Sequence, residues 1–150
     1  DSWYRTAGEA APAGKELTAW SGQTLAQWTG SAGFGDMAFR DGLLRGTTDT
    51  RDPVLTSSAL NVRAGRYTRL AVEMRLDKPG GGAQLFWSTA STTANEAASV
   101  AVPTVSDGQW HTYIFEVGKN PYWGGCVTSL RFDPVSAEGV AVEIRSIRLE

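Results

Sequence analysis

Short apolar runs broken by turn residues limit most strongly what this chain can fold into. In residues 70–77 every second residue is apolar, namely Leu70, Val72, Met74 and Leu76. The residues between them include Glu73 and Arg75, so one side of an extended segment is apolar and the other is largely polar. No stretch keeps the three-to-four residue spacing of an amphipathic helix. The pattern predicts β-strands with one buried face.

Similar runs recur along the chain, separated by glycine, proline, aspartate and asparagine. We expect strands near 24–29, 36–40, 42–47, 54–62, 67–77, 83–89, 97–105, 111–118, 127–133 and 140–149. Asp41-Gly42 is a hairpin turn signal, and further breaks fall at 79–82 and 107–108. Many short strands joined by polar turns predict an all-β fold, a two-sheet antiparallel β-sandwich of the jelly-roll kind.

The last expected strand changes phase once. Val140, Val142 and Ile144 share one face, whereas Ile147 and Leu149 occupy the other phase. One extra residue in a strand produces this change, so we predict a β-bulge between the two groups.

The length of 150 residues fits one domain. Residues 1–19 are rich in small and turn-forming types and are expected to form an N-terminal arm, with Trp3 and Tyr4 docked on the body or in a lead-in strand. Residues 20–150 are expected to form the sandwich.

The chain begins at Asp1 without a signal peptide, so we expect a secreted or cell-surface module of a larger bacterial protein whose export signal lies outside this segment. The single cysteine, Cys126, is expected to be buried.

Charge gives no reason to expect a charged partner. The net charge is −2, and no cluster of lysine and arginine occurs. Nucleic acid and anionic membranes both call for a concentrated basic surface. No apolar run approaches the roughly 18 residues of a membrane span. We therefore expect neither nucleic acid nor a membrane as partner.

Tryptophan is the most frequent aromatic residue, with six copies against five phenylalanines and four tyrosines. Trp28 is expected in the core, and Trp20 is expected either in the core or as a cover over a sheet edge. Trp87, Trp110 and Trp123 lie at or beside turn signals, where binding residues concentrate. An exposed indole face matches the C–H face of a sugar ring. Trp87 shares a strand face with Leu85, so burial is the open alternative for it.

Polar residues near these tryptophans are candidate partners for sugar hydroxyls. Tyr122 and Asn120 flank Trp123, and Glu96 lies in a polar connection. Gln84 and Arg131 are out of phase with their apolar neighbours and are expected to point away from the core. A surface salt bridge is the alternative role for Arg131.

Catalytic and metal-binding patterns are weak. His111, the only histidine, alternates with core-type residues and is expected to be a satisfied, partly buried residue at the start of a strand. A glycosidase needs two carboxylates across one bond, and the sequence pairs none of its carboxylates in this way. We expect no enzyme activity and no cofactor. Asp49 and Asp52 leave structural Ca²⁺ open as an alternative to simple turn formation.

Several stretches together resemble a bacterial carbohydrate-binding module of the galactose-binding-domain-like jelly-roll type. They are the segments 41–46, 51–55, 83–87, 107–113, 130–134 and 142–149, including Asp107-Gly108-Gln109-Trp110-His111 and Leu130-Arg131-Phe132-Asp133-Pro134. The resemblance implies this architecture, and together with the tryptophans near turns it implies a noncatalytic module that binds polysaccharide or oligosaccharide and is linked to a glycan-active enzyme. We expect the module to be a monomer. A structural or adhesive sandwich without a sugar ligand, or a small polysaccharide lyase or hydrolase, are the alternatives.

Overall fold

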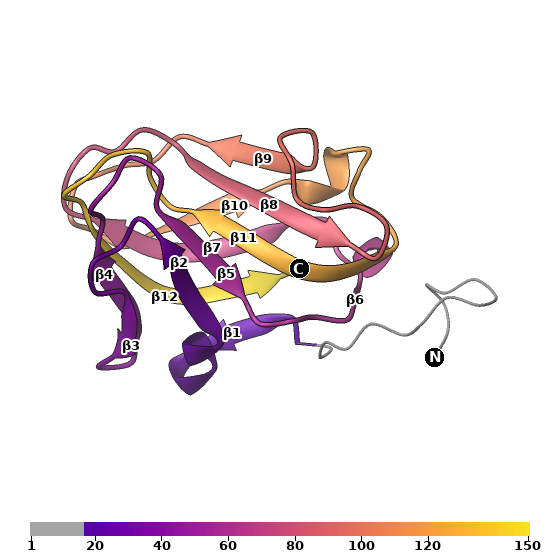
Figure 1. Ribbon diagram of the computed structural model, residues 1–150, viewed down its shortest axis with the longest axis horizontal. Coiled ribbons are helices and arrows are strands. Elements are labelled where there is room, and N and C mark those ends of the chain that lie inside the picture. Colours follow the sequence, from indigo (N-terminus) through magenta and orange to yellow (C-terminus); the bar gives the residue numbers. More distant parts are fainter. Residues whose placement is uncertain (1–16) are drawn as a thin grey trace.

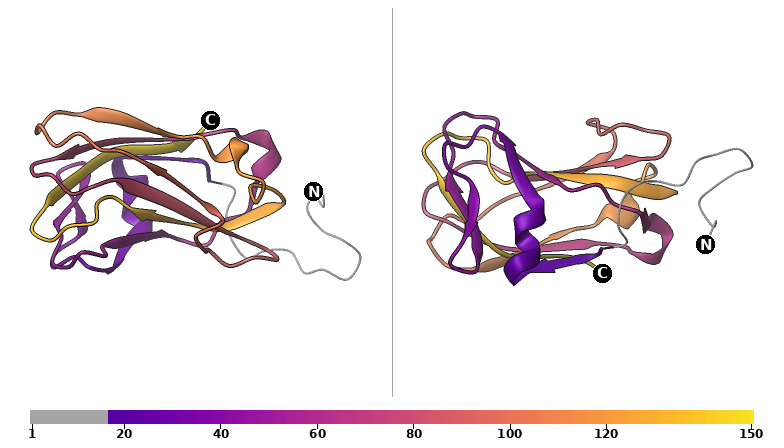
Figure 2. Two further views of the ribbon diagram at one scale, coloured as in Figure 1. Left: turned by 90° about the horizontal axis from the view of Figure 1, so that it is seen from above. Right: turned by 60° about the horizontal axis from the view of Figure 1, so that its bottom comes forward.

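The computed structural model describes residues 17–150, which form two antiparallel sheets packed face to face (Figures 1 and 2). The predicted two-sheet β-sandwich is confirmed. The chain passes repeatedly from one sheet to the other, as in a jelly roll. Most of the expected N-terminal arm, with Trp3 and Tyr4, lies outside the described residues. Within the described part of the chain, no helix is long and apolar enough to cross a membrane.

The first sheet lies at the back in Figure 1 and has the strand order β10-β7-β12-β4-β3. Its strands are β10 (His111–Phe115), β7 (Leu70–Leu76), β12 (Ala141–Leu149), β4 (Leu43–Thr47) and β3 (Ala38–Arg40). A further strand, β1 (Ala19–Ser21), pairs with the last part of β12. The central strand β12 is thus bordered by β7 on one side and by β4 and β1 on the other.

The second sheet lies at the front and has the order β2-β5-β11-β8-β9. Its strands are β2 (Trp28–Ala32), β5 (Val54–Ser57), β11 (Cys126–Asp133), β8 (Ala83–Thr89) and β9 (Ser99–Val102). The short strand β6 (Val62–Arg63) pairs with the start of β11. Because β11 contacts β8 along its length, these two strands form the middle of the sheet.

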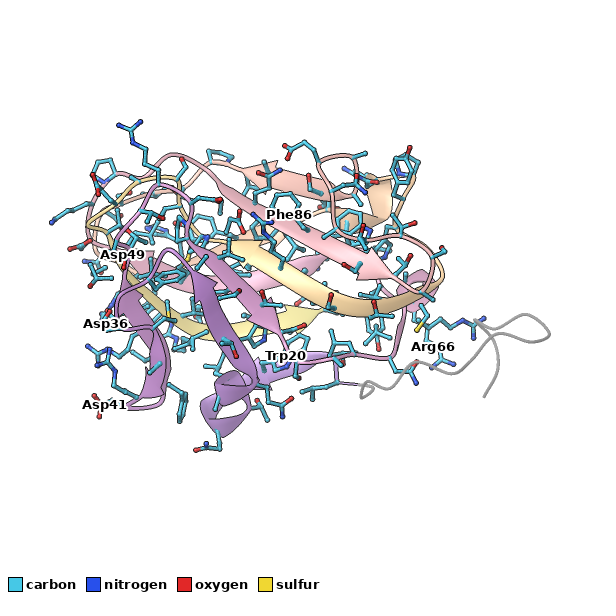
Figure 3. All side chains as sticks on the ribbon, viewed as in Figure 1. Trp20, Asp36, Asp41, Asp49, Arg66 and Phe86 are labelled. Atoms are coloured by element: carbon cyan, nitrogen blue, oxygen red, sulfur yellow. The ribbon has the colours of Figure 1, made fainter. Side chains whose placement is uncertain are left out.

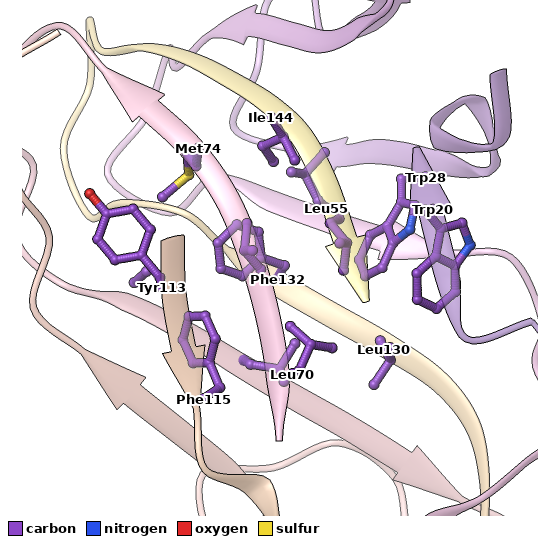
Figure 4. Close-up of a cluster of buried hydrophobic side chains, with 14 of the residues drawn as sticks. Trp20, Trp28, Leu55, Leu70, Met74, Tyr113, Phe115, Leu130, Phe132 and Ile144 are labelled. Atoms are coloured by element: carbon purple, nitrogen blue, oxygen red, sulfur yellow. The ribbon is translucent and has the colours of Figure 1, made fainter. Parts of the chain in front are cut away.

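The core fills the space between the sheets with alternate side chains from each strand (Figure 4). Trp20 and Trp28 are buried, as expected, and pack edge to face with ring centroids 5.4 Å apart. Phe115 of the back sheet meets Phe132 of the front sheet in the same geometry. Such pairs stabilise a core beyond simple burial, by about 0.5–1.5 kcal/mol each. Cys126 is buried, also as expected.

Two local predictions are confirmed in detail. The pairing of β12 with β7 shifts register between Ile144 and Ser146, which is the predicted bulge. Asp41 and Gly42 both have positive φ, 54° and 79°, and connect β3 to β4. Positive φ at both central residues is the signature of the tight hairpin turn that Asp-Gly favours.

Two expected strands differ from the structure. The strand expected at 24–29 begins only at Trp28, as β2, because residues 22–27 form a 3₁₀ helix, η1 (Gly22–Gln27). The Thr24 hydroxyl accepts a hydrogen bond from the Ser21 N–H and donates one to the Ser21 carbonyl, which closes this turn. The expected strand 54–62 is split into β5 and β6. The first pairs with the end of β11, at Arg131 and Phe132, and the second pairs with its start, at Cys126 and Val127. The other two 3₁₀ turns are η2 (Ala64–Arg66) and η3 (Val117–Lys119).

Candidate functional site

The outer face of the front sheet carries a row of side chains with one residue from each of its five long strands. Pairing across the sheet aligns Thr29, Thr56, Arg131, Phe86 and Ser99 in that order. Gln84 and Asp133 lie opposite each other in the neighbouring row. We call the surface formed by these seven residues the Arg131 face. The residues between them along the strands, such as Leu85 and Phe132, are fully buried on the opposite side.

Arg131 lies at the centre of this face and is held in place on two sides. Its Nε and Nη2 atoms each donate a hydrogen bond of 2.9 Å to the two carboxylate oxygens of Asp133. Its guanidinium carbon lies 4.5 Å from the ring centroid of Phe86. Figure 3 shows Phe86 on the front layer. The two hydrogen bonds to Asp133 and the contact with the Phe86 ring fix the position of the guanidinium group. Its remaining N–H groups are left as donors.

Asp133 is the buried partner of this pair. Burial raises the pKa of the Asp133 carboxyl, the bonds from Arg131 act in the opposite direction, and the charges of Asp52 and Glu96 add to the increase. In turn, the hydrogen bond from Asp133 raises the pKa of Arg131. Both Asp133 oxygens are used to hold Arg131. The pair therefore suits the placement of a hydrogen-bond donor better than it suits proton transfer.

The rest of the face presents amide, hydroxyl and carboxylate groups. The Gln84 side-chain amide donates to the Glu96 carboxylate at 2.8 Å and to the Ser99 hydroxyl at 3.0 Å. The hydroxyls of Ser31 and Thr56 are 2.7 Å apart. The amide and hydroxyl groups can donate and accept hydrogen bonds at the same time, and the carboxylate accepts them. The Arg131 face is therefore chemically suited to a ligand that carries many hydroxyl groups.

Three of the predicted site residues meet here. Gln84 and Arg131 point away from the core, as their phase predicted, and Glu96 lies against Gln84. Sequence reasoning missed Phe86 and Asp133. Phe86 lies two positions after Gln84, and Asp133 lies two positions after Arg131. Because side chains two positions apart lie on the same face of a strand, the alternation that selected Gln84 and Arg131 also indicates these two residues. The expected alternative role of Arg131 in a salt bridge is also present, with Asp133 as partner.

Trp87 is 1% exposed and points into the core. The expectation that its ring is open to solvent is wrong, because it shares the inward phase of Leu85. Its indole N–H donates to the Tyr122 carbonyl at 3.1 Å, and its ring meets the edge of Trp123 at a centroid distance of 5.1 Å. Trp87 anchors the loop that contains Tyr122 and Trp123.

That loop lies at one end of β9. The Asn120 side chain donates to the carbonyls of Ala97 and Ser99 and accepts from the Tyr122 N–H. Trp123 is half-buried, and its indole N–H donates to two carbonyls, those of Ala64 and Tyr67, both at 2.9 Å. Tyr122 is the exposed aromatic of the loop, at 55%. Ligand binding by Asn120, Tyr122 and Trp123 stays a prediction.

Trp110 directly precedes β10 and lies beside the back sheet. It is half-buried between the guanidinium groups of Arg75 and Arg145, whose carbons lie 4.9 and 4.3 Å from the ring centroid. Arg75 belongs to β7 and Arg145 to β12, both in the back sheet. Trp110 therefore lies apart from Gln84 and Arg131, since the two sheets present opposite surfaces, and ligand binding by Trp110 stays a prediction.

His111 begins β10, as expected, and its Nε2 lies 2.8 Å from the Asp107 carboxylate. Within residues 17–150 no group of three or more histidine, cysteine, aspartate or glutamate residues could hold a metal ion. Asp52 lies 3.8 Å from the Arg131 guanidinium, a cation that would oppose Ca²⁺ there. Calcium binding by Asp49 and Asp52 stays a prediction.

No protein-family model and no curated protein matches the chain. Solved structures share its fold. A low-affinity xylan-binding module, CBM86, from the gut symbiont Roseburia intestinalis is 15% identical, with a TM-score of 0.60, over 88% of this chain and 92% of that chain. A family 29 carbohydrate-binding module is 11% identical, with a TM-score of 0.59, over 93% of this chain and 86% of that chain.

A family 29 variant in complex with cellulohexaose is 12% identical, with a TM-score of 0.59, over 89% of this chain and 93% of that chain. At these identities the likeness shows the fold. The chain has a β-sandwich fold that carbohydrate-binding modules share. The resemblance that its sequence indicated is confirmed at that level.

Proposed function

We propose that the protein is a noncatalytic carbohydrate-binding module that binds polysaccharide or oligosaccharide on the Arg131 face. The observation that carries this proposal is the row of outward-pointing side chains across all five long strands of the front sheet, centred on Arg131. The shared fold with CBM86 and family 29 modules supports it.

The chemistry of the face indicates how a sugar would bind. Arg131 covers the ring of Phe86, which is only 6% exposed, so the ligand meets a guanidinium plane and neighbouring amide and hydroxyl groups. Hydrogen bonds that replace bonds to water contribute about 0.5–1.5 kcal/mol each, or about 1.5–3 kcal/mol to a charged group. A few such bonds give an affinity in the roughly micromolar to millimolar range.

The exposed Tyr122 would extend this contact surface. Its loop is tied to the Ser99 carbonyl through Asn120, and Ser99 also ends the row on the Arg131 face. Tyr122 therefore adjoins the site from the side of β9. We propose that Tyr122, rather than a tryptophan, supplies the solvent-exposed aromatic contact to a sugar ring.

We propose further that the module is secreted or held at the cell surface, acts as a monomer without a cofactor, and raises the local substrate concentration for a linked glycan-active enzyme. The absence of a catalytic role is supported by Asp133, whose two oxygens both hold Arg131. Binding is expected to survive EDTA. A loss of binding in EDTA that calcium restores would instead favour a metal at Asp49 and Asp52.

Affinity electrophoresis in gels that contain soluble neutral glycans, including xylan, glucomannan and hydroxyethylcellulose, tests the proposal. We expect at least one glycan to retard the protein and the substitutions Gln84→Ala and Arg131→Gln to weaken retardation. Arg69→Gln is the matched control, because Arg69 is another partly exposed arginine in an ion pair, at 50% against 36% for Arg131, and it pairs with Glu150 beside the back sheet. Gln84→Ala leaves the buried Asp133–Arg131 pair intact, so its fold is not in question.

Each other outcome counts against a particular part of the proposal. Absence of retardation by any glycan would favour a structural or adhesive sandwich. Retardation unchanged by both variants would place the site elsewhere. Release of reducing ends from the same glycans would show a lyase or hydrolase.

A further inference from the structure

The back sheet also presents a continuous row on its outer surface. His111 pairs with Met74, so Trp110, one residue earlier, lies beside Arg75 in the antiparallel register. Arg75 pairs with Glu143, and Glu143 pairs with Arg45. The row therefore runs across β10, β7, β12 and β4. We call this surface the Trp110 face. Its residues are Trp110, Arg75, Glu143 and Arg45 of the row, together with the neighbouring Arg40 and Arg145.

Arginine is concentrated in the strands of this sheet, and each of these arginines pairs with a carboxylate. The strands contain five arginines and two glutamates, namely Arg40, Arg45, Arg75, Arg145 and Arg148 against Glu73 and Glu143. The strands of the front sheet contain only Arg63, Arg131 and Asp133 as charged residues. A chain with a net charge of −2 thus keeps most of its strand arginines on one surface.

Two further carboxylates that pair with these arginines lie at exposed positions. Asp41 is 84% exposed where it contacts Arg45 at 3.1 Å, and Asp36 is 56% exposed where it lies 3.8 Å from Arg40. Figure 3 shows both aspartates at the edge of the molecule that carries the β3–β4 hairpin. Exposed ion pairs of this kind add little stability. A ligand carboxylate could replace either aspartate at small cost.

A hollow of about 250 Å³ lies at this end of the row. It is lined by Asp36, Arg40, Arg45, Gly46, Thr47 and Glu143, among others. Gly46 allows β4 to lie close to Met37 beside this hollow, because a Cβ there would lie 2.6 Å from the Met37 Cα. Three strand spacings, about 14 Å, separate the hollow from Trp110. The surface is long enough to contact several linked sugars.

We propose that the Trp110 face is a second glycan-binding surface, separate from the Arg131 face, and that it takes polysaccharides that carry carboxylate groups. Guanidinium groups pair with carboxylates through two parallel hydrogen bonds. Trp110 holds Arg75 and Arg145 against its ring, which fixes both guanidinium groups on this face. Glu73 and Glu143 alternate with the arginines, which disfavours a densely charged polyanion such as nucleic acid.

This inference does not depend on the proposed function of the Arg131 face, and its experiment is separate. Isothermal titration with polygalacturonate, and with the same polymer after chemical reduction of its carboxyl groups, compares a uronate with its neutral counterpart. We expect binding of the polyuronate only, with an affinity that falls between about 50 mM and about 500 mM NaCl because salt screens exposed charges.

Variants locate the site. Arg45→Gln is expected to weaken polygalacturonate binding about tenfold, as loss of one charge-assisted pair would. Trp110→Ala is expected to weaken it by a similar factor, whereas Gln84→Ala on the Arg131 face leaves it unchanged. Circular dichroism and the midpoint of thermal unfolding check that each variant is folded. Lack of polyuronate binding, equal binding of the reduced polymer, or loss of binding in Gln84→Ala would each overturn the proposal.

Discussion

Replacement of Trp123 by alanine separates a structural role from a ligand-binding role. Its half-buried ring packs against the edge of Trp87, and its N–H serves two main-chain carbonyls. Removal of a fully buried tryptophan costs about 3–5 kcal/mol. For a half-buried ring we take about 2 kcal/mol, and add about 1 kcal/mol for the aromatic contact and about 1 kcal/mol for the carbonyls that lose their donor.

The expected loss in the free energy of unfolding is therefore about 4 kcal/mol, which would lower the unfolding midpoint by roughly 10 °C in a domain of this size. Trp123→Phe keeps a ring and loses the N–H, so we expect a loss of about 1–2 kcal/mol. Urea unfolding measures both values. Glycan retardation, measured well below the midpoint, reports on binding separately.

The structural reasoning would be refuted by a Trp123→Ala protein that is as stable as the unchanged protein. If that stable variant also lost glycan retardation, Trp123 would be a ligand-stacking residue. If instead the Trp123→Ala protein were destabilised and its migration were still retarded by glycan, the Trp123 ring would stabilise the fold and would not be needed for binding.

The remaining predictions concern packing and pH. Gly46→Ala should lower stability by about 1–3 kcal/mol, because its Cβ would overlap the Met37 main chain, whereas Gly124→Ala meets no atom within 4 Å and should be tolerated in thermal unfolding. Burial raises the pKa of Asp133, so its contribution to stability is lost as pH rises above the ordinary aspartate range, and Asp133→Asn should remove this loss. The hydrogen bond from Arg145 lowers the pKa of Glu73, so its contribution is present above the ordinary glutamate range and is lost as pH falls through the folded-state pKa. Urea unfolding from about pH 3 to about pH 7 should show a shallower acid limb for Glu73→Gln.

Strand patterns in the sequence were sufficient for the fold. The alternation from Leu70 to Leu76 and the phase change after Ile144 report directly on which side of a strand is buried. The segment at 22–27 was misjudged, because its apolar residues are too few to distinguish a strand from a 3₁₀ turn closed by Thr24.

The candidate site was only partly accessible from the sequence. Phase alone indicated that Gln84 and Arg131 point outward. The contact between Arg131 and Phe86 depends on the register between β11 and β8, which pairing across the sheet sets and a single sequence does not reveal. The same limit explains Trp110, whose position near a turn did not show to which sheet it belongs.

Nuclear magnetic resonance titration tests the central claim most directly. The side-chain N–H signals of Gln84 and Arg131 report on the Arg131 face, and the indole N–H signal of Trp110 reports on the opposite surface. On addition of xylohexaose or cellohexaose, we predict shifts for Gln84, Arg131 and the Ser99 main chain, with Trp110 unchanged. Shifts confined to the Trp110 face, or no shifts with either oligosaccharide, would contradict the account.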